Sequence, residues 1–211
     1  KVDVIIEELQ AELLIRLKDM QSEKQNIGFA HGYSGIAYAL SKVDQKNKSD
    51  KNEKIIIDLL EKEYGLINNQ KDQRWCWGIP GMLKARLEMD KARSNEVIAF
   101  QKNALVDLFL NNIEEYSVQD DTLCHGNSGI ISILVKLKNY ELNTNQIEVI
   151  NCYLNKYSLM IVENQLISDN FSLLALPQIE PVGLFTGISG IGLSLLETSF
   201  DISSDIQMLL S

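Results

Sequence analysis

Leu123-Cys124-His125-Gly126-Asn127-Ser128-Gly129-Ile130 places two soft metal ligands side by side, with a glycine directly after them. Neighbouring side chains diverge in a regular helix or strand, so Cys124 and His125 can share a metal only in a turn. Gly126 permits such a turn, and the apolar run that begins at Ile130 predicts a helix after it. The stretch therefore reads as a ligand-bearing turn at the start of a helix.

The same glycine pattern occurs four times along the chain. Gly-x-x-Gly pairs begin at Gly32, Gly78, Gly126 and Gly187, at separations of 46, 48 and 61 residues. A period in the high forties, with two helices in each unit, is typical of helical-hairpin repeats. Repeats that curve into a ring would bring the glycine turns to one end of a barrel. The sequence thus predicts an all-α fold.

Apolar residues recur at helical spacing over most of the chain, and no segment alternates as a strand would. We expect helices over residues 2–20, 36–43, 56–64, 83–87, 97–108, 130–137, 147–162 and 187–200. Val97, Phe100, Ala104 and Leu108 mark the fifth of these. The charged run Asp44–Lys54 is expected to be a solvated loop, residues 168–185 a long loop and residues 201–211 a loosely patterned tail.

Cys76 lies 48 residues before Cys124, which is about one repeat. Equivalent turns of neighbouring repeats are neighbours in space, so Cys76 is expected to meet Cys124 and His125. Two thiolates and one imidazole would form a three-ligand zinc site whose fourth position is open, as in catalytic sites. The alternatives are a small buried cysteine at position 76 and a core cysteine beside a capping histidine at positions 124 and 125.

Composition and charge narrow the class of protein. The net charge is −9 and the pI is about 4.8, which argues against a nucleic-acid-binding protein. Three cysteines without a secretory signal indicate a reducing, cytoplasmic compartment, and no apolar stretch is long enough for a transmembrane helix. Cys152 has no glycine turn beside it, and we expect it in the middle of a helix with its side chain in the protein core.

Four motifs now coincide in order, and together they resemble the C-terminal half of a lanthionine synthetase C-like protein, a lantibiotic cyclase. The motifs are Gly28-Phe29-Ala30-His31-Gly32, Trp75-Cys76-Trp77-Gly78-Ile79-Pro80-Gly81, Leu123-Cys124-His125-Gly126 and Gly183-Leu184-Phe185-Thr186-Gly187-Ile188-Ser189-Gly190-Ile191-Gly192. The resemblance implies an α/α toroid, present here as a single domain over residues 1–211 with roughly four of the family's seven helical hairpins. We therefore expect a fragment of a longer fold.

The resemblance also implies roles for particular residues. Cys76, Cys124 and His125 match the zinc ligands of the family, and His31 matches a histidine implicated in proton transfer. His31 could instead be a structural histidine that bonds a turn carbonyl. An aspartate that the family carries upstream of the His-Gly motif has no counterpart here.

Three further positions near the second motif are read less directly. Trp77 stands where the family usually has tyrosine, and Arg74 is out of register with a family arginine. Trp75 is expected to pack between helices, while Trp77 could either line a substrate channel or pack.

The implied reaction is zinc-dependent formation of lanthionine and methyllanthionine thioether rings from peptide cysteines and dehydroalanine or dehydrobutyrine. The implied partner is a dehydrated precursor peptide, with a dehydratase and a transporter as candidate members of a complex that would associate this cytoplasmic chain with the membrane. Two alternatives remain open. One is a zinc-dependent thiol-binding or glutathione-binding scaffold without cyclase activity, and the other is a purely structural helical-repeat protein.

Overall fold

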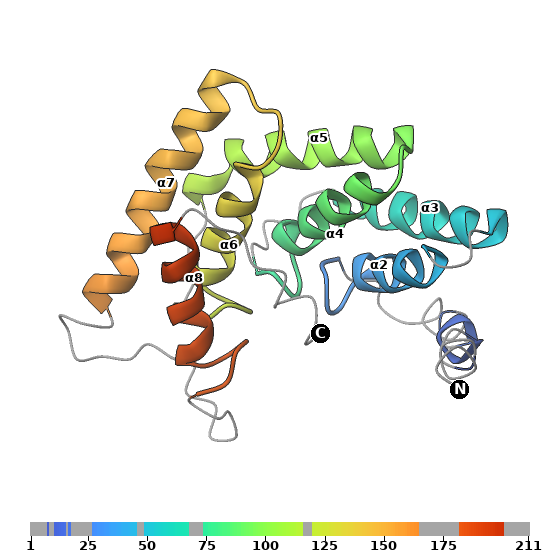
Figure 1. Cartoon of the computed structure of the whole chain (residues 1–211), viewed down its shortest axis with the longest axis horizontal. Helices are drawn as coiled ribbons and strands as arrows, with labels where there is room; N and C mark the ends of the chain where they lie inside the picture. The colour runs from blue at the N-terminus through green and yellow to red at the C-terminus, as the bar shows by residue number, and fades with distance from the viewer. Residues whose placement is uncertain are drawn as a thin grey trace. The chain divides into compact units, whose positions relative to one another are not determined.

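The computed structural model describes residues 8, 11–15, 17, 27–45, 49–67, 74–115, 120–164 and 182–200. Across these ranges the chain forms helices joined by turns, and no strand occurs in them (Figure 1). Of the helix expected over residues 2–20, the described residues 8, 11–15 and 17 are helical. Most of the expected loop over 168–185 and the whole tail over 201–211 lie outside the described residues.

The chain divides into two compact units, and each is described by itself. The first comprises Lys1–Lys71 and Trp77–Leu105, and the second comprises Asp72–Cys76 and Val106–Ser211. The single domain over residues 1–211 stays a prediction. No helix among the described residues is both long enough and apolar enough to cross a membrane.

The first unit is built around helix α2 (Tyr33–Asp44), which packs against both α3 (Asp50–Tyr64) and α4 (Ile79–Ala92). All residues of α4 from Ile79 to Met89 are buried, although the stretch includes lysine, arginine and glutamate. Charged side chains are rarely buried unless they are paired, and Arg86 on α4 has such a partner in Glu63 on α3, 2.8 Å away.

The charged run Asp44–Lys54 is not the solvated loop expected from sequence. Helix α3 begins at Asp50, and Asp50 and Glu53 lie in its first turn, where negative charge favours a helix. Asp44 ends α2 as a buried residue, and its carboxylate accepts hydrogen bonds from Ser49 N at 2.9 Å and Arg93 Nη2 at 2.6 Å. The run therefore connects two helices beside an ion pair between the buried Asp44 and the half-buried Arg93.

Helix α5 (Glu96–Asn111) forms where the periodicity predicts it, but its buried face is different from the apolar residues that mark it in the sequence. Phe100 is 65% exposed, whereas Ile98, Gln101, Leu105 and Phe109 are buried. The polar Gln101 lies on the buried face because its side chain accepts hydrogen bonds from Arg86 at 3.3 and 3.2 Å. Because the polar Gln101 is part of the buried face of α5, that face could not be identified from the apolar residues alone.

The second unit is built around α6 (Asn127–Leu137), every residue of which is buried. Helix α6 packs against α7 (Thr144–Val162) and α8 (Ile188–Phe200), and the 3₁₀ turn η1 (Ile113–Glu115) precedes the segment that leads to it. Asn143 and Gln146 form a reciprocal capping box at the start of α7. A helix that is buried on all sides, as α6 is, must lie inside a core, to which α7 and α8 contribute.

Gly-x-x-Gly pairs start the helices for a steric reason. The residues before α2, α4 and α6 have φ values of −109°, −131° and −122°, which any residue adopts; they are Gly32, Gly78 and Gly126. At the second glycine of three pairs, a Cβ atom would lie 2.2, 2.4 or 1.9 Å from the carbonyl oxygen six residues earlier; these glycines are Gly35, Gly129 and Gly190. The glycines are therefore needed because the turn folds back onto the helix start, and not for an unusual φ.

Candidate metal centre and the His31 turn

The turn before α6 is held by its own polar residues. Asp120 Oδ1 accepts hydrogen bonds from Thr122 N at 2.7 Å and from Thr122 Oγ1 at 2.6 Å. The Thr122 hydroxyl oxygen in turn accepts from His125 N at 3.3 Å, and Thr122 O accepts from Gly126 N at 2.9 Å. Asp120 and Thr122 thus fix the backbone on which Cys124 and His125 stand, a role that their place just before the motif could have suggested.

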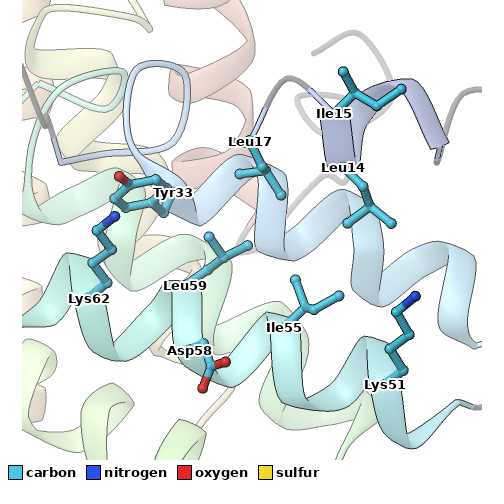
Figure 2. A pocket seen from close by; sticks show the side chains of 9 residues that line it. All are labelled: Leu14, Ile15, Leu17, Tyr33, Lys51, Ile55, Asp58, Leu59 and Lys62. Atoms are coloured by element: carbon cyan, nitrogen blue, oxygen red, sulfur yellow. The ribbon is translucent and has the colours of Figure 1, made fainter. Parts of the chain in front are cut away.

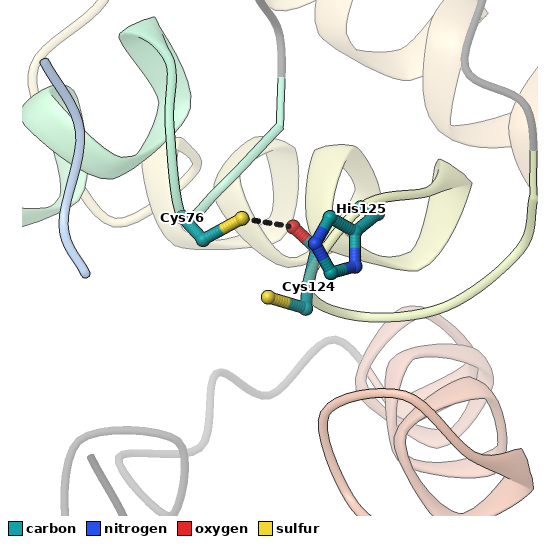
Figure 3. Close-up of side chains that lie close together, drawn as sticks. All are labelled: Cys76, Cys124 and His125. Atoms are coloured by element: carbon teal, nitrogen blue, oxygen red, sulfur yellow. Dashed lines mark hydrogen bonds between the residues drawn. The ribbon is translucent and has the colours of Figure 1, made fainter. Parts of the chain in front are cut away.

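Cys76, Cys124 and His125 come together in the second unit. One ligand atom from each residue lies within 4.8 Å of the others. Cys76 is buried, Cys124 and His125 are half-buried, and Cys76 Sγ lies 3.5 Å from the Cys124 carbonyl oxygen (Figure 3). This is the juxtaposition that the 48-residue spacing predicts, and binding of a metal by the three residues stays a prediction.

The donor set fits a zinc ion. Cysteine sulfur and histidine nitrogen are the preferred protein ligands of Zn²⁺, and three of them leave the fourth position open. Within the described parts of the chain, His125 Nδ1 is buried and has no hydrogen-bond partner. A buried polar nitrogen without a partner is costly, and a cation held with the two neighbouring sulfurs would satisfy it.

The close approach of Cys76 shifts the pKa values of both Cys124 and His125. Interaction with Cys76 raises the pKa of the Cys124 thiol, and burial and the Asp120 carboxylate raise it further, while the Arg74 charge lowers it. Interaction with Cys76 likewise raises the pKa of His125 and outweighs burial, which lowers it. Two adjacent thiols resist ionising together unless a cation is present. Arg74 is exposed and acts on the cluster through its charge.

The cluster turn is tied to the segment before α8. Cys124 N donates to Phe185 O at 2.8 Å, and the Phe185 ring stacks on Trp75 with centroids 5.5 Å apart. Trp75 is 4% exposed, which agrees with the packing role expected for it. Phe185, in the segment before α8, therefore contacts both Trp75 and the turn that carries Cys124.

Cys152 is not in the core, contrary to the expectation from sequence. It is exposed on α7, whose buried face is made by Ile150, Tyr153, Leu154, Tyr157 and Ile161. Cys152 directly precedes the buried Tyr153 but projects to the outer face, because adjacent positions on a helix are about 100° apart. Its thiol takes no part in the cluster.

His31 lies in the turn before α2, in the first unit. Its side chain is exposed, and its ring stacks on Trp77 with centroids 4.0 Å apart and an interplanar angle of 26°. The stack gives Trp77 a specific role that its sequence position left undecided. The indole packs against one face of the imidazole, and the His31 side chain remains exposed.

A cavity of about 510 Å³ lies in the same unit, between α3 and the helical residues near the N-terminus (Figure 2). Leu14, Leu17, Ile55 and Leu59 supply its apolar wall, and Tyr33 also lines it. No residue of the Cys76 cluster lines this cavity. It is a feature of the first unit in its own right, and no signal in the sequence indicated it.

Comparison with known proteins agrees with this architecture. A search of curated proteins gives no match. Among solved structures, a chain titled "Nisin cyclase" matches with a TM-score of 0.55 and 19% identity, covering 85% of this chain and 48% of that chain. The likeness shows the fold and confirms the all-α toroid class predicted from sequence, and the chain spans about half the length of that relative. The family model described as lanthionine synthetase C-like protein matches residues 2–210, and the chain therefore belongs to the lanthionine synthetase C-like family.

Proposed function

We propose that this chain acts in lanthipeptide cyclisation, as a zinc-dependent catalyst of thioether formation. The observation that carries the proposal is the cluster of Cys76, Cys124 and His125, whose ligand atoms lie within 4.8 Å of one another. Zinc held by these three residues would lower the pKa of an incoming peptide thiol and keep the thiolate in place. The family match supports the same reading.

The reaction is an addition without oxidation or reduction. The peptide thiol loses its proton, an S–Cβ bond forms as the Cα=Cβ π bond of the dehydrated residue breaks, and the α-carbon takes up a proton. His31 has an exposed imidazole, and an imidazole can take up and release a proton in acid–base catalysis, so it is suited to deliver that proton. The substrate is a dehydrated precursor peptide that carries cysteine.

Metal content tests the first part of the proposal. The chain should hold zinc stoichiometrically, and Co²⁺ in its place should give thiolate-to-metal charge-transfer absorption. Cys76→Ala and Cys124→Ala should lose both signals. Cys152→Ala is the matched control, because that cysteine is exposed and outside the cluster, and it should keep both. Loss of metal from Cys152→Ala alone, or its retention in both cluster variants, contradicts the proposal.

Ring formation tests the second part. The addition leaves the peptide mass unchanged, so cyclisation is measured by protection of cysteine from alkylation and by fragmentation that reports ring topology. Cyclisation should fall in Cys76→Ala, Cys124→Ala and His125→Ala and persist in Cys152→Ala. A chain that binds zinc and a thiol but leaves the dehydrated peptide uncyclised is a thiol-binding module instead.

A further inference from the structure

The turn that carries His31 is held by hydrogen bonds to a carboxylate from another helix. Glu63, on α3, accepts hydrogen bonds through Oε1 from Gly28 N and Ser34 N, both at 3.1 Å. Its second oxygen, Oε2, accepts from the Ser34 hydroxyl. One side chain thus binds the backbone on both sides of His31, three residues before it and three residues after it.

This contact replaces a helix cap that the turn lacks. The residue at the N-cap of α2 is Gly32, which has no side chain to accept from the first backbone N–H groups. Glu63 accepts from Ser34 N, in the first turn of α2, where a negative charge also favours the helix dipole. A Cβ on Gly32 would lie 2.2 Å from Glu63 Oε1, so the glycine is what admits the carboxylate.

The carboxylate is held in turn by a buried arginine. Arg86 Nη1, on α4, lies 2.8 Å from Glu63 Oε2, and neither side chain has any exposed surface. Arg86 also donates to the Ser34 hydroxyl, to Leu60 O at 3.2 Å and to Gln101 Oε1. A buried charge pair is favourable only with such additional hydrogen bonds, and here they connect α2, α3, α4 and α5 at one point.

We propose that Glu63, with Arg86 and Ser34, is a positioning group for His31: it fixes the turn so that the imidazole stays stacked on Trp77. The inference rests on the proposed function for the role of His31 in proton transfer. Proton delivery to a carbon requires a donor held at a defined place, and small displacements of such a group reduce turnover strongly. Glu63 acts through the turn and does not itself contact the peptide.

The position of His31 can be read without measuring activity. The chain has two histidines, so the imidazole protons give two sets of NMR signals, which His31→Gln assigns. The ring current of Trp77 displaces the His31 signals, and Trp77→Leu gives their unstacked position. Ser34→Ala and Glu63→Gln should move the His31 signals towards that unstacked position, with zinc content unchanged.

Kinetics supply the second readout. In Ser34→Ala and Glu63→Gln the kcat for cyclisation should fall by about ten- to a hundredfold, with KM nearly unchanged. Ser41→Ala is the matched control. Ser41 is also a buried serine on α2 bonded to an arginine, Arg93, but it lies away from the His31 turn. Its His31 signals and kcat should match those of the unaltered chain.

The outcomes separate this inference from the proposed function. Unchanged His31 signals in a folded Ser34→Ala variant overturn the positioning role, and that variant decides the question alone if Glu63→Gln does not fold. If His31→Gln cyclises peptide at the normal rate, proton transfer by His31 fails, and the NMR signals still decide whether Glu63 positions the ring. Equal effects of Ser34→Ala and Ser41→Ala reduce Glu63 to general stabilisation and also overturn the positioning role.

Discussion

At the scale of single residues, the absence of a side chain matters as much as the presence of a ligand. Gly126 follows the two candidate ligands, and a Cβ there would lie 2.2 Å from Asp120 O and 2.5 Å from Thr122 N. Its φ of −122° is ordinary, so the glycine is required for space. Among the described glycines, a positive φ occurs at Gly28, where φ is 108°. Gly126 therefore serves the turn through close packing and not through an unusual φ.

Gly126→Ala should consequently disturb the ligand turn. Because backbone atoms would have to move, we expect a loss of about 1–3 kcal/mol in the free energy of unfolding, together with weaker zinc binding. Gly192→Ala is the control, since a Cβ on Gly192 meets nothing within 4 Å. It should be neutral or stabilising by up to about 1 kcal/mol. Urea denaturation measures the stability of both variants, and metal analysis measures their zinc content. Equal stability and zinc content of the two variants would show that the turn can accommodate a Cβ at position 126.

At the scale of elements, the spacing of apolar residues and of repeats predicts the helix positions correctly, but it does not predict which polar side chains are buried. Helices α2 to α8 form where apolar spacing places them, and the repeat spacing brings Cys76 to Cys124 and His125. Glu63 lies on the buried face of α3, which Ile56, Leu59 and Leu60 also form. A glutamate at helical spacing from these apolar residues is unusual and could have been noticed in the sequence. The pairing of Glu63 with Arg86 could not be predicted from sequence, because Arg86 comes from another helix and only the tertiary structure brings the two together.

The Asp44–Arg93 contact makes an element-scale prediction about pH. Burial raises the pKa of Asp44, but hydrogen bonds from Arg93, Ser49 and Asn52 and the Arg93 charge lower it by more, so the net shift is downward. A lowered pKa in the folded state stabilises the protein above the unfolded pKa of about 3.9, and that stability is lost as the pH falls through the folded value. Asp44 joins the end of α2 to the start of α3.

Asp44→Asn should therefore lower the free energy of unfolding at pH 7 by about 1–3 kcal/mol. The difference from the unaltered chain should begin to shrink as the pH falls below about 4, where Asp44 becomes protonated in the unfolded chain. It should go on shrinking as the pH approaches the lower pKa that Asp44 has in the folded state. Asp58→Asn is the control, because Asp58 is exposed on α3. Urea denaturation from pH 3 to pH 7 measures both variants. A difference that stays constant over this range would assign the effect to packing instead of charge.

At the scale of the whole molecule, the candidate metal site lies within one compact unit. Cys76, Cys124 and His125 all belong to the second unit, although 48 residues separate the two cysteines along the chain. A metal that binds the folded state adds stability in proportion to the logarithm of its concentration over Kd. It also closes a long loop that is open in the unfolded chain. Zinc should therefore stabilise the second unit, with helices α6, α7 and α8, as a body.

Removal of zinc should lower Tm by about 5–10 °C, which corresponds to about 2.7 kcal/mol at a metal concentration a hundred times Kd. Amide hydrogen exchange should rise in α6 and α7 and stay unchanged in α2 and α3, because the latter belong to the first unit. Cys76→Ala should melt at the lower temperature with or without zinc, whereas Cys152→Ala should retain the full shift. A zinc-dependent shift that survives in Cys76→Ala would place the bound metal elsewhere and remove the physical basis for zinc-assisted thiol chemistry at this cluster.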